Sequence, residues 1–433
     1  MLDIINLLLP VVLGMVTGIV IGLVPGVGIW AVLVLLFPFI KFFDFWQIIG
    51  IWLGTCIGSQ YFGSVATLLL KVPGENSSLV FLNDVDKLTV QDRLQLIKET
   101  AYGSFFASMI SLVLMFLLLH FAVDAFSILS SYKIRAATYI VLFSVLILVD
   151  KNKLTTAALV VIGVLLAEKT DYTLPTWVFK IQEVTTDLTT LSLMLGLLII
   201  PEIFTRSGTS KPLSLDSGIK FKPITLSAVK QMCIGALVGL LGGTVPGQSA
   251  TFSSVIAYNA NKETIKNRII RSESADNSAV LIGILPLIML GVPITIDAVL
   301  LTNILSIKLI QLPDGVTTNL NLLVPGSAID LILYFILFFS VIFFVLSQTF
   351  LTFYVKVVSC ITTHNKIVFL LLSSWMIWVD HIIQPIGSYY WIFLSLVSLL
   401  GIFLKRKNIN TIPLILGFIL GDQIYWSFSY FLH

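Results

Sequence analysis

Residues 13–28 read LGMVTGIVIGLVPGVG, and residues 234–249 read IGALVGLLGGTVPGQS. In both stretches a glycine stands at every fourth position and a Pro-Gly pair follows, so the two patterns coincide when Gly14 is aligned with Gly235. Glycines at this spacing lie on one face of a helix and allow the backbone of a neighbouring helix to approach closely. The duplicated pattern therefore predicts two equivalent, closely packed helices, each ending at a Pro-Gly break.

Two further blocks repeat in the same or nearly the same register. Pro73 follows the first Pro-Gly pair at almost the same interval as Pro293 follows the second. LSLMLGLLIIPEI at 191–203 matches IPLILGFILGDQI at 412–424, with Gly196 aligned to Gly417. Several blocks in one register predict that the chain is an internal duplication.

The composition places both halves in a membrane. The 433 residues are 57% hydrophobic and only 11% charged, with many apolar runs. We predict an all-α polytopic membrane protein with about 10–12 transmembrane segments. Its two structurally repeated halves are residues 1–220 and 221–433, with Pro/Gly-broken or re-entrant helices in each. No GxxxxGK[ST] loop or long polar stretch is present, which argues against a built-in nucleotide-hydrolysing domain and a nucleic-acid partner.

Basic residues suggest how the halves are oriented. Lys and Arg concentrate in 203–223, 261–272 and 405–407, whereas the equivalent loops of the other half carry fewer charges. Because Lys and Arg accumulate in cytoplasmic loops, this difference suggests that the halves are inverted relative to each other.

The prolines at 25, 73, 246 and 293 each interrupt an apolar segment. A proline removes a backbone hydrogen bond, and the freed groups are tolerated at membrane depth only inside protein or beside a wet cavity. We therefore expect the four breaks to converge near mid-membrane, two from each half. Such paired breaks are typical of the binding site of a secondary transporter. The alternative is that they are helix kinks or interfacial turns.

Residues around the breaks are small or hydrophilic. A helix that restarts after a break exposes N–H groups and the positive end of its dipole, and hydroxyl and amide groups add donors without net charge. These features suit a small organic anion such as a carboxylate. The predicted substrate-binding residues are Gly26, Gly28, Ser59, Ser64, Gly74, Asn76, Ser77, Gly247, Gln248, Ser249, Ser253 and Asn277.

Glu273 and Asp276 are the candidates for coupling transport to an ion gradient, because ionisable residues within membrane segments default to functional roles. They would bind Na⁺ or exchange a proton. If Na⁺ binds to neutral oxygens, Asn277 and Ser278 are the expected ligands. The alternative is that both acids lie at the cytoplasmic surface and balance Arg271. We expect no other metal and no cofactor.

At these residues the chain resembles the large membrane subunit of the tripartite tricarboxylate transporters, the TctA-like family. The resemblance rests on GLVPGVG (22–28), GSQYFGSVATLLLKVPGENSS (58–78), GGTVPGQSATFSSVIAYNANK (242–262), SESADNSAVLIGILPLIMLGVP (272–293) and PLILGFILG (413–421). It implies an ion-gradient-driven importer of di- or tricarboxylates, multi-pass in a prokaryotic inner membrane and surrounded by lipid. It also implies a small membrane subunit and an extracytoplasmic substrate-binding protein as partners.

The chain departs from the family pattern at three positions: Asp276 and Lys71 each replace an Asn, and Thr295 replaces a Gly. Rival classes are a channel, a scaffold membrane protein and an intramembrane protease. Gly421-Asp422 resembles part of a GxGD aspartyl motif, but position 419 is Ile. We therefore expect a transporter and no enzyme.

Overall fold

The structure is a computed structural model. It describes residues 2–22, 24, 28–36, 39, 42–61, 63–70, 76–82, 84–121, 132–150, 152–166, 190–205, 222–247, 249–290, 293–295, 297–298, 300–301, 328–349, 353–354, 356–357, 365–383, 390–407 and 409–421. Within these ranges the regular elements are helices, and one isolated parallel bridge joins Gly247 to Thr295. The predicted all-α class is confirmed.

The first half contains helices that end before each predicted break and restart after it. They are α1 (Leu2–Gly22), α2 (Trp30–Leu36), α3 (Phe45–Gln60), α4 (Gly63–Leu70), the 3₁₀ helices η2 (Asn76–Val80) and η3 (Val85–Lys87), α5 (Val90–Phe121), α7 (Tyr132–Val149), α8 (Lys153–Leu166), α10 (Thr190–Met194), the π-helical turn η5 (Leu195–Ile199) and α11 (Ile200–Thr205).

The second half begins with the same order of helices. Its elements are α12 (Leu226–Gly242), α13 (Ser249–Asn259), α14 (Ile265–Ile282), α15 (Leu285–Leu290), α17 (Ala328–Thr349), α19 (Asn365–Ile383), α20 (Tyr390–Arg406) and α21 (Ile412–Ile419). Helices α12 to α15 thus follow α1 to α4 in about the register of the sequence repeat.

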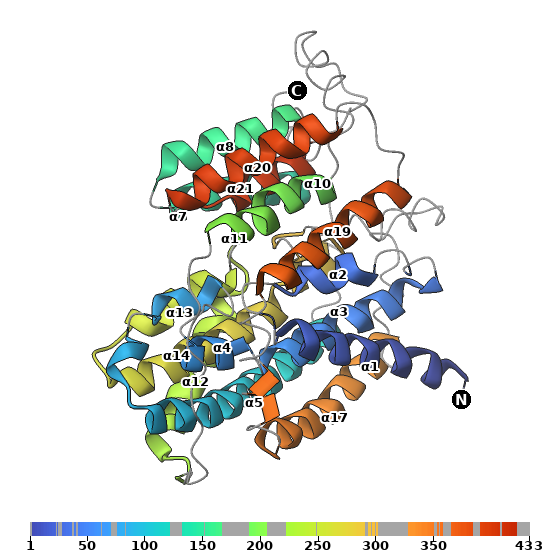
Figure 1. The fold of residues 1–433 in the computed structure, drawn as a ribbon. Coiled ribbons are helices and arrows are strands. Elements are labelled where there is room, and N and C mark those ends of the chain that lie inside the picture. Colours follow the sequence, from blue (N-terminus) through green and yellow to red (C-terminus); the bar gives the residue numbers. More distant parts are fainter. Residues whose placement is uncertain are drawn as a thin grey trace.

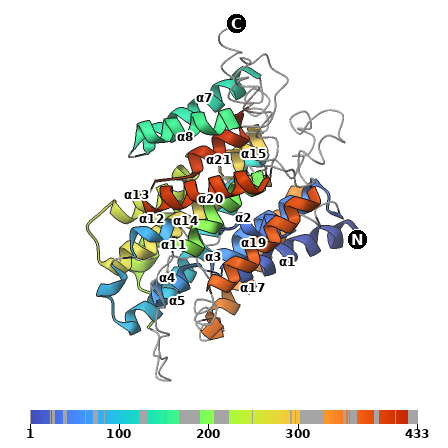
Figure 2. The ribbon, with the colours of Figure 1, turned by 45° about the horizontal axis from the view of Figure 1, so that its top comes forward.

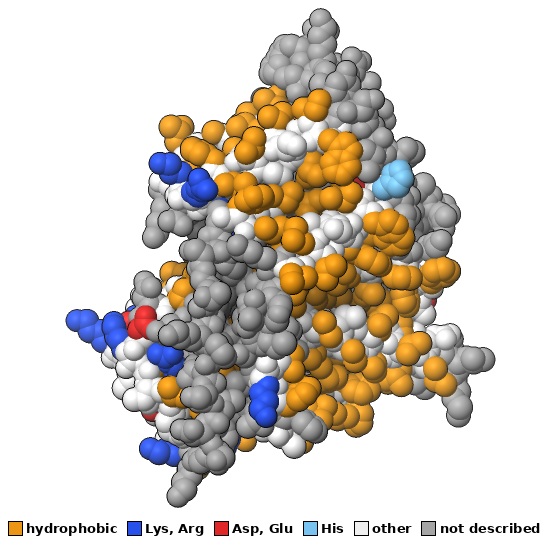
Figure 3. Space-filling view, viewed as in Figure 1, with side chains coloured by type: hydrophobic (Ala, Val, Ile, Leu, Met, Phe, Trp, Pro, Cys, Tyr) orange, Lys and Arg blue, Asp and Glu red, His pale blue; other side chains and the backbone are white. Residues whose placement is uncertain are grey.

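Several helices can cross a membrane by length and composition. Within the described residues, four are long and apolar: Ile5–Gly22, Phe45–Leu69, Val90–Leu119 and Asp330–Thr349. Shorter apolar helices are Ala137–Leu148, Lys153–Leu166, Leu226–Gly242 and Ile367–His381. Hydrophobic side chains also cover much of the surface shown in Figure 3. These features confirm a polytopic membrane protein.

Glycines bring the first and third helices of each half into backbone contact. A Cβ built on Gly14 of α1 would lie 2.0 Å from the carbonyl oxygen of Ile51 on α3. The equivalent Gly235 of α12 would place a Cβ 2.2 Å from the carbonyl oxygen of Arg271 on α14. Only a residue without a Cβ fits such an approach, so each glycine stripe selects the packing partner of its helix.

Helices of each half pack on helices of the other half. Helix α5 of the first half packs on α12 and α14, and α17 of the second half packs on α1 and α3. In the same way α8 packs on α21, while α20 packs on η5. Figure 1 shows α7, α8, α20 and α21 grouped together, above the group that contains α1, α3, α5, α12, α14 and α17, whereas in the turned view of Figure 2 α7 and α8 lie at the edge and α20 overlaps the larger group.

Within this larger group, α3 and α14 approach each other from different sides (Figure 1). Helix α3 begins beside the start of α1, where the Gln47 side chain donates to the Asn6 carbonyl at 3.1 Å. Its last residue, Gln60, donates to the carbonyl of Asn277 in α14 at 2.9 Å. The C-terminal parts of the two helices therefore meet inside the protein.

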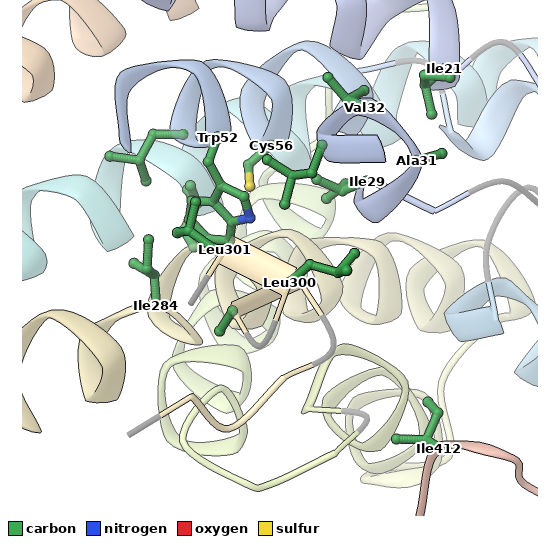
Figure 4. Close-up of a cluster of buried hydrophobic side chains, with 14 of the residues drawn as sticks. Ile21, Ile29, Ala31, Val32, Trp52, Cys56, Ile284, Leu300, Leu301 and Ile412 are labelled. Atoms are coloured by element: carbon green, nitrogen blue, oxygen red, sulfur yellow. The ribbon is translucent and has the colours of Figure 1, made fainter. Parts of the chain in front are cut away.

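An apolar cluster joins the two halves beside this meeting point (Figure 4). Trp52 and Cys56 of α3 lie next to Leu300 and Leu301, which follow the second break of the second half. All four are buried, with exposed fractions of 3% or less. This apolar packing holds Leu300 and Leu301 against the first half.

Candidate functional site

The two breaks of the second half lie side by side. Pro246 stands between α12 and α13, and Pro293 stands after α15. The Gly247 N–H donates to the Ile294 carbonyl at 2.7 Å, and Gly247 has a φ of +90°, a conformation that favours glycine. The freed backbone groups are thus partly satisfied by pairing one break with the other. The first-half prolines, Pro25 and Pro73, lie outside the described residues.

Buried polar side chains connect the halves where α3, α5 and α14 meet. The Gln60 amide donates to the Asn277 carbonyl, and its Oε1 accepts a hydrogen bond from Ser108 at 2.7 Å. The Asn277 Nδ2 donates to Ser104 at 2.5 Å. Ser111 and Ser278 share a hydrogen bond of 2.8 Å. We call Gln60, Ser104, Ser108, Ser111, Asn277 and Ser278 the polar interface.

The α5 members of this interface were not among the residues predicted from the sequence. Thr100, Ser104, Ser108 and Ser111 follow one another at spacings of four, four and three residues, which places them on one face of α5. Thr100 also shares a hydrogen bond of 3.1 Å with Ser64, a predicted site residue on α4. The missed signal was this regular polar stripe, which continues from the polar start of α5 into its apolar part, in a helix that contains no proline.

The two candidate ion-coupling acids lie on α14 and are inside the protein. Glu273 is 6% exposed and Asp276 is 4% exposed. Arg271 is completely buried, and its guanidinium donates to carbonyls that end α13, to Ala257 at 2.5 Å and Tyr258 at 3.5 Å, and to the Gln231 side chain at 3.1 Å. The side chains of both acids are therefore buried rather than exposed in a surface loop.

The other predicted substrate residues that the structure describes are buried or half-buried. Ser249 and Ser253 are buried at the start of α13, where Ser253 donates to the Ser249 carbonyl at 2.7 Å. Ser59 is buried and donates to Cys56 within its own helix, at 3.1 Å.

Two more residues belong to the first half. Ser77 is buried in η2, and the half-buried Gly28 accepts from the Ala31 N–H at 3.0 Å. Gly26, Gly74, Gln248 and the side chain of Asn76 lie outside the described residues, as do Lys71, Glu75 and Asp422.

The structure therefore brings the predicted residues together in two places. Asn277 and Ser278 lie in the polar interface, and Ser64 lies beside it. Gly247, Ser249 and Ser253 lie at the Pro246 break of the second half. Helix α12 links the two places, because Gly239 packs on Ser278 and Gly242 packs on Ser253. Both places offer neutral donors and acceptors, and the two buried acids lie on the helix that carries Asn277.

A charged cluster joins the loops at one end of α5 and α14. Asp84 accepts hydrogen bonds from Tyr258 and from Lys87, the latter at 2.5 Å, and lies 3.9 Å from Arg268. Asp92 pairs with Lys266. The hydrogen bond from Lys87, followed by that from Tyr258, holds the pKa of Asp84 below its ordinary value. These contacts tie Asp84 and the start of α5, in the first half, to the end of α13 and the start of α14, in the second half.

The sequence is similar to those of known proteins over most of its length. The family described as "Tripartite tricarboxylate transporter TctA family" matches residues 8–416. A protein of Agrobacterium vitis, named "Uncharacterized 52.8 kDa protein in TAR-I ttuC' 3'region", is 26% identical over 309 residues. The match covers 65% of this chain and 60% of that protein, so the chain spans about three fifths of its relative. No solved structure matches the chain.

Proposed function

The chain belongs to the tripartite tricarboxylate transporter TctA family, and we propose that it is a secondary active transporter that imports a small organic anion. The family is one of transporters, and no enzymatic activity is proposed for the chain. The anion is of the di- or tricarboxylate class, and a gradient of Na⁺ or H⁺ drives its uptake. It binds at the broken helices between the two halves.

The observation that carries this proposal is the meeting of both halves at buried, uncharged polar groups beside paired helix breaks. Gly247 pairs with the second break of its half, and Gln60 reaches across to Asn277. A protein that only anchors a partner in the membrane does not need such groups, since buried polar side chains within a bilayer are costly. A site of neutral donors holds a carboxylate without the permanent charge that would prevent its release.

Glu273 and Asp276 are proposed to carry the ion coupling. Their burial on α14, three residues apart, supports an arrangement in which one carboxyl binds Na⁺ or exchanges a proton while substrate lies near Asn277. If Na⁺ instead binds to neutral oxygens, Asn277 and Ser278 are its ligands.

We further propose that residues 1–220 and 221–433 are inverted repeats. The matched order of the first four helices, the equivalent glycine contacts of Gly14 and Gly235, and the exchanged packing of α5 and α17 support this proposal. The different directions from which α3 and α14 enter the protein support the inversion.

The orientation in the membrane follows from the charges. Lys87 lies in η3 before α5, and Lys266 and Arg268 lie in the first turn of α14. In Figure 3 most Lys and Arg side chains lie toward one side of the view. Because Lys and Arg are in excess on the cytoplasmic side of membrane proteins, this side faces the cytoplasm of a prokaryotic cell. The starts of α1 and α3 then face outward. An extracytoplasmic binding protein would deliver substrate to the outward side, and a small membrane subunit completes the assembly.

Membrane-impermeant thiol labelling in cells tests both the orientation and the inversion. Single cysteines are placed at Phe42 and Lys262, in a background without the native cysteines. We expect labelling from outside at position 42 and none at 262. Labelling of both positions from the same side would contradict the inversion.

Transport is tested with the full chain, reconstituted into vesicles with its partner subunits. A carboxylate panel is first screened by the shift in thermal unfolding of the purified chain, and uptake of the best ligand is then followed under imposed Na⁺ and H⁺ gradients. Accumulation against the ligand's own gradient is expected of a transporter, whereas uptake that stops at equal concentrations would indicate a channel.

Binding residues are tested by Ser64→Ala, Ser249→Ala, Ser253→Ala and Asn277→Ala. Each is expected to weaken uptake by about 1–3 kcal/mol where a buried partner loses its hydrogen bond. The matched control is Ser347→Ala, because Ser347 is buried on α17 and donates within its own helix, to Phe344 at 2.7 Å. Normal uptake by all four variants would place the site elsewhere.

A further inference from the structure

From the hydrogen bonds at the α3–α5–α14 contact we infer that Gln60 is a positioning residue, which holds Asn277 in place across the boundary between the two halves. The inference rests on the proposed function, because Asn277 is a binding residue only if the chain transports an anion through this region. Gln60 itself is not a predicted ligand.

Gln60 uses both ends of its amide to join two helices. It is the last residue of α3 and is 4% exposed. Its Nε2 donates to the backbone carbonyl of Asn277 on α14 at 2.9 Å, and its Oε1 accepts from Ser108 on α5 at 2.7 Å. A carbonyl can only accept, so the Asn277 oxygen requires the NH₂ group of Gln60 on its side and determines the orientation of the amide.

Contacts with Ser104 determine the orientation of the Asn277 side chain. Its Nδ2 donates to Ser104 on α5 at 2.5 Å, and the Ser104 hydroxyl in turn lies 3.4 Å from the Gln60 carbonyl. Gln60, Asn277 and Ser104 thus form a closed ring of contacts between three helices. Because the backbone of Asn277 is held by Gln60 and its side chain by Ser104, neither can turn without breaking a buried hydrogen bond.

The position of Gln60 in the chain extends its influence to a second predicted ligand. Helix α4, which carries Ser64, begins at Gly63, three residues after Gln60. Ser64 contacts Thr100, one turn before Ser104 on α5. Gln60 therefore lies between Ser64 of the first half and Asn277 of the second, and its loss would change the spacing between two proposed binding residues.

Two substitutions of Gln60 separate positioning from simple packing. Gln60→Leu keeps the approximate volume but removes both hydrogen bonds. Gln60→Glu keeps the acceptor for Ser108 and donates to the Asn277 carbonyl only when the carboxyl is protonated. The matched control is Thr55→Val, because Thr55 is buried on the same helix and its hydroxyl bonds to Ile51 of that helix, at 2.8 Å.

The experiment measures KM and maximal uptake rate in vesicles between pH 5 and 8, each variant normalised to the wild type at the same pH. Gln60→Leu is expected to raise KM by about tenfold at every pH, the size of effect expected when the Asn277 carbonyl loses its one buried hydrogen bond from Gln60. Gln60→Glu is expected to approach the wild-type KM at low pH and the Leu variant at high pH. Thr55→Val should keep the wild-type KM.

The outcomes distinguish this inference from the proposed function. A wild-type KM in Gln60→Leu, or a raised KM in Gln60→Glu that does not depend on pH, would overturn the positioning role while leaving the transporter intact. If the wild type neither binds nor transports any anion, the proposed function fails and the inference fails with it. If Gln60→Leu does not fold, the pH dependence of KM in Gln60→Glu decides alone.

Discussion

The close contact of α1 with α3 makes a quantitative prediction for Gly14→Ala. A Cβ at this position would lie 2.0 Å from the Ile51 carbonyl oxygen, far inside the 3.4 Å at which ordinary contact begins. The obstacle is backbone, so it cannot turn away, and the two helices must separate along their shared length. Overpacking of this kind costs about 1–3 kcal/mol, and the better helix propensity of Ala returns up to about 1 kcal/mol.

The assay is the thermal unfolding midpoint of the purified full chain in detergent. Gly50→Ala is the matched control, because Gly50 lies on α3 in the same helix pair but the nearest atom to its Cβ would belong to a side chain, Cγ2 of Val11, at 3.1 Å, and no backbone atom would lie closer than 3.8 Å. We expect Gly14→Ala to lower the midpoint clearly and Gly50→Ala to leave it nearly unchanged.

The equivalent glycine of the second half extends the test. Gly235→Ala should lower the midpoint by about as much as Gly14→Ala, since its Cβ would lie 2.2 Å from the Arg271 carbonyl oxygen. The double variant should show additive losses, because the two glycines contact different helix pairs. A midpoint for Gly14→Ala that equals that of Gly50→Ala would refute the argument from close backbone contact.

Three further predictions concern charged residues. Asp276→Asn or Glu273→Gln should abolish the dependence of uptake on the ion gradient while the anion still shifts thermal unfolding; retained dependence in both variants would remove the acids from the coupling mechanism. Because Lys87 lowers the pKa of Asp84, the stability from this pair is present above the unfolded pKa of about 4 and is lost as the pH falls through the lower folded pKa. The unfolding midpoint of the wild type should therefore fall more between pH 6 and 3 than that of Asp84→Asn, and equal falls would contradict the pairing. Arg271→Met should destabilise the chain by about 1–3 kcal/mol, because the carbonyls at the end of α13 lose a buried donor; an unchanged midpoint would show that they find other partners.

Helix order and break positions were predictable from the sequence because they depend on local chemistry. A proline followed by glycine favours the end of a helix, and the structure has α12 ending at Gly242 and α13 restarting at Ser249 around Pro246. Pro10, which no glycine follows, lies inside α1 instead. The glycine spacing likewise predicted a closely packed face on α1 and α12. In each case the determining interaction lies within a few residues of the chain.

The candidate site was only partly accessible to this reasoning. Ser64, Ser249 and Asn277 were selected because they are hydrophilic residues in the apolar segments that flank the breaks, and they are buried. Thr100, Ser104 and Ser108 were missed because α5 has no break to draw attention to it. Their polar stripe could have been read from its helical spacing, but the stripe alone does not say which helix faces it.

What the sequence by itself determined is therefore the membrane class, the duplicated pattern and the points at which helices end. Tertiary structure alone decided which polar groups meet. Gln60 and Asn277 lie far apart in the chain, and their hydrogen bond exists because α3 and α14 enter the protein from different sides and α5 packs beside both. A helical period specifies which side chains share a face, whereas the partner of that face depends on how all the helices pack together.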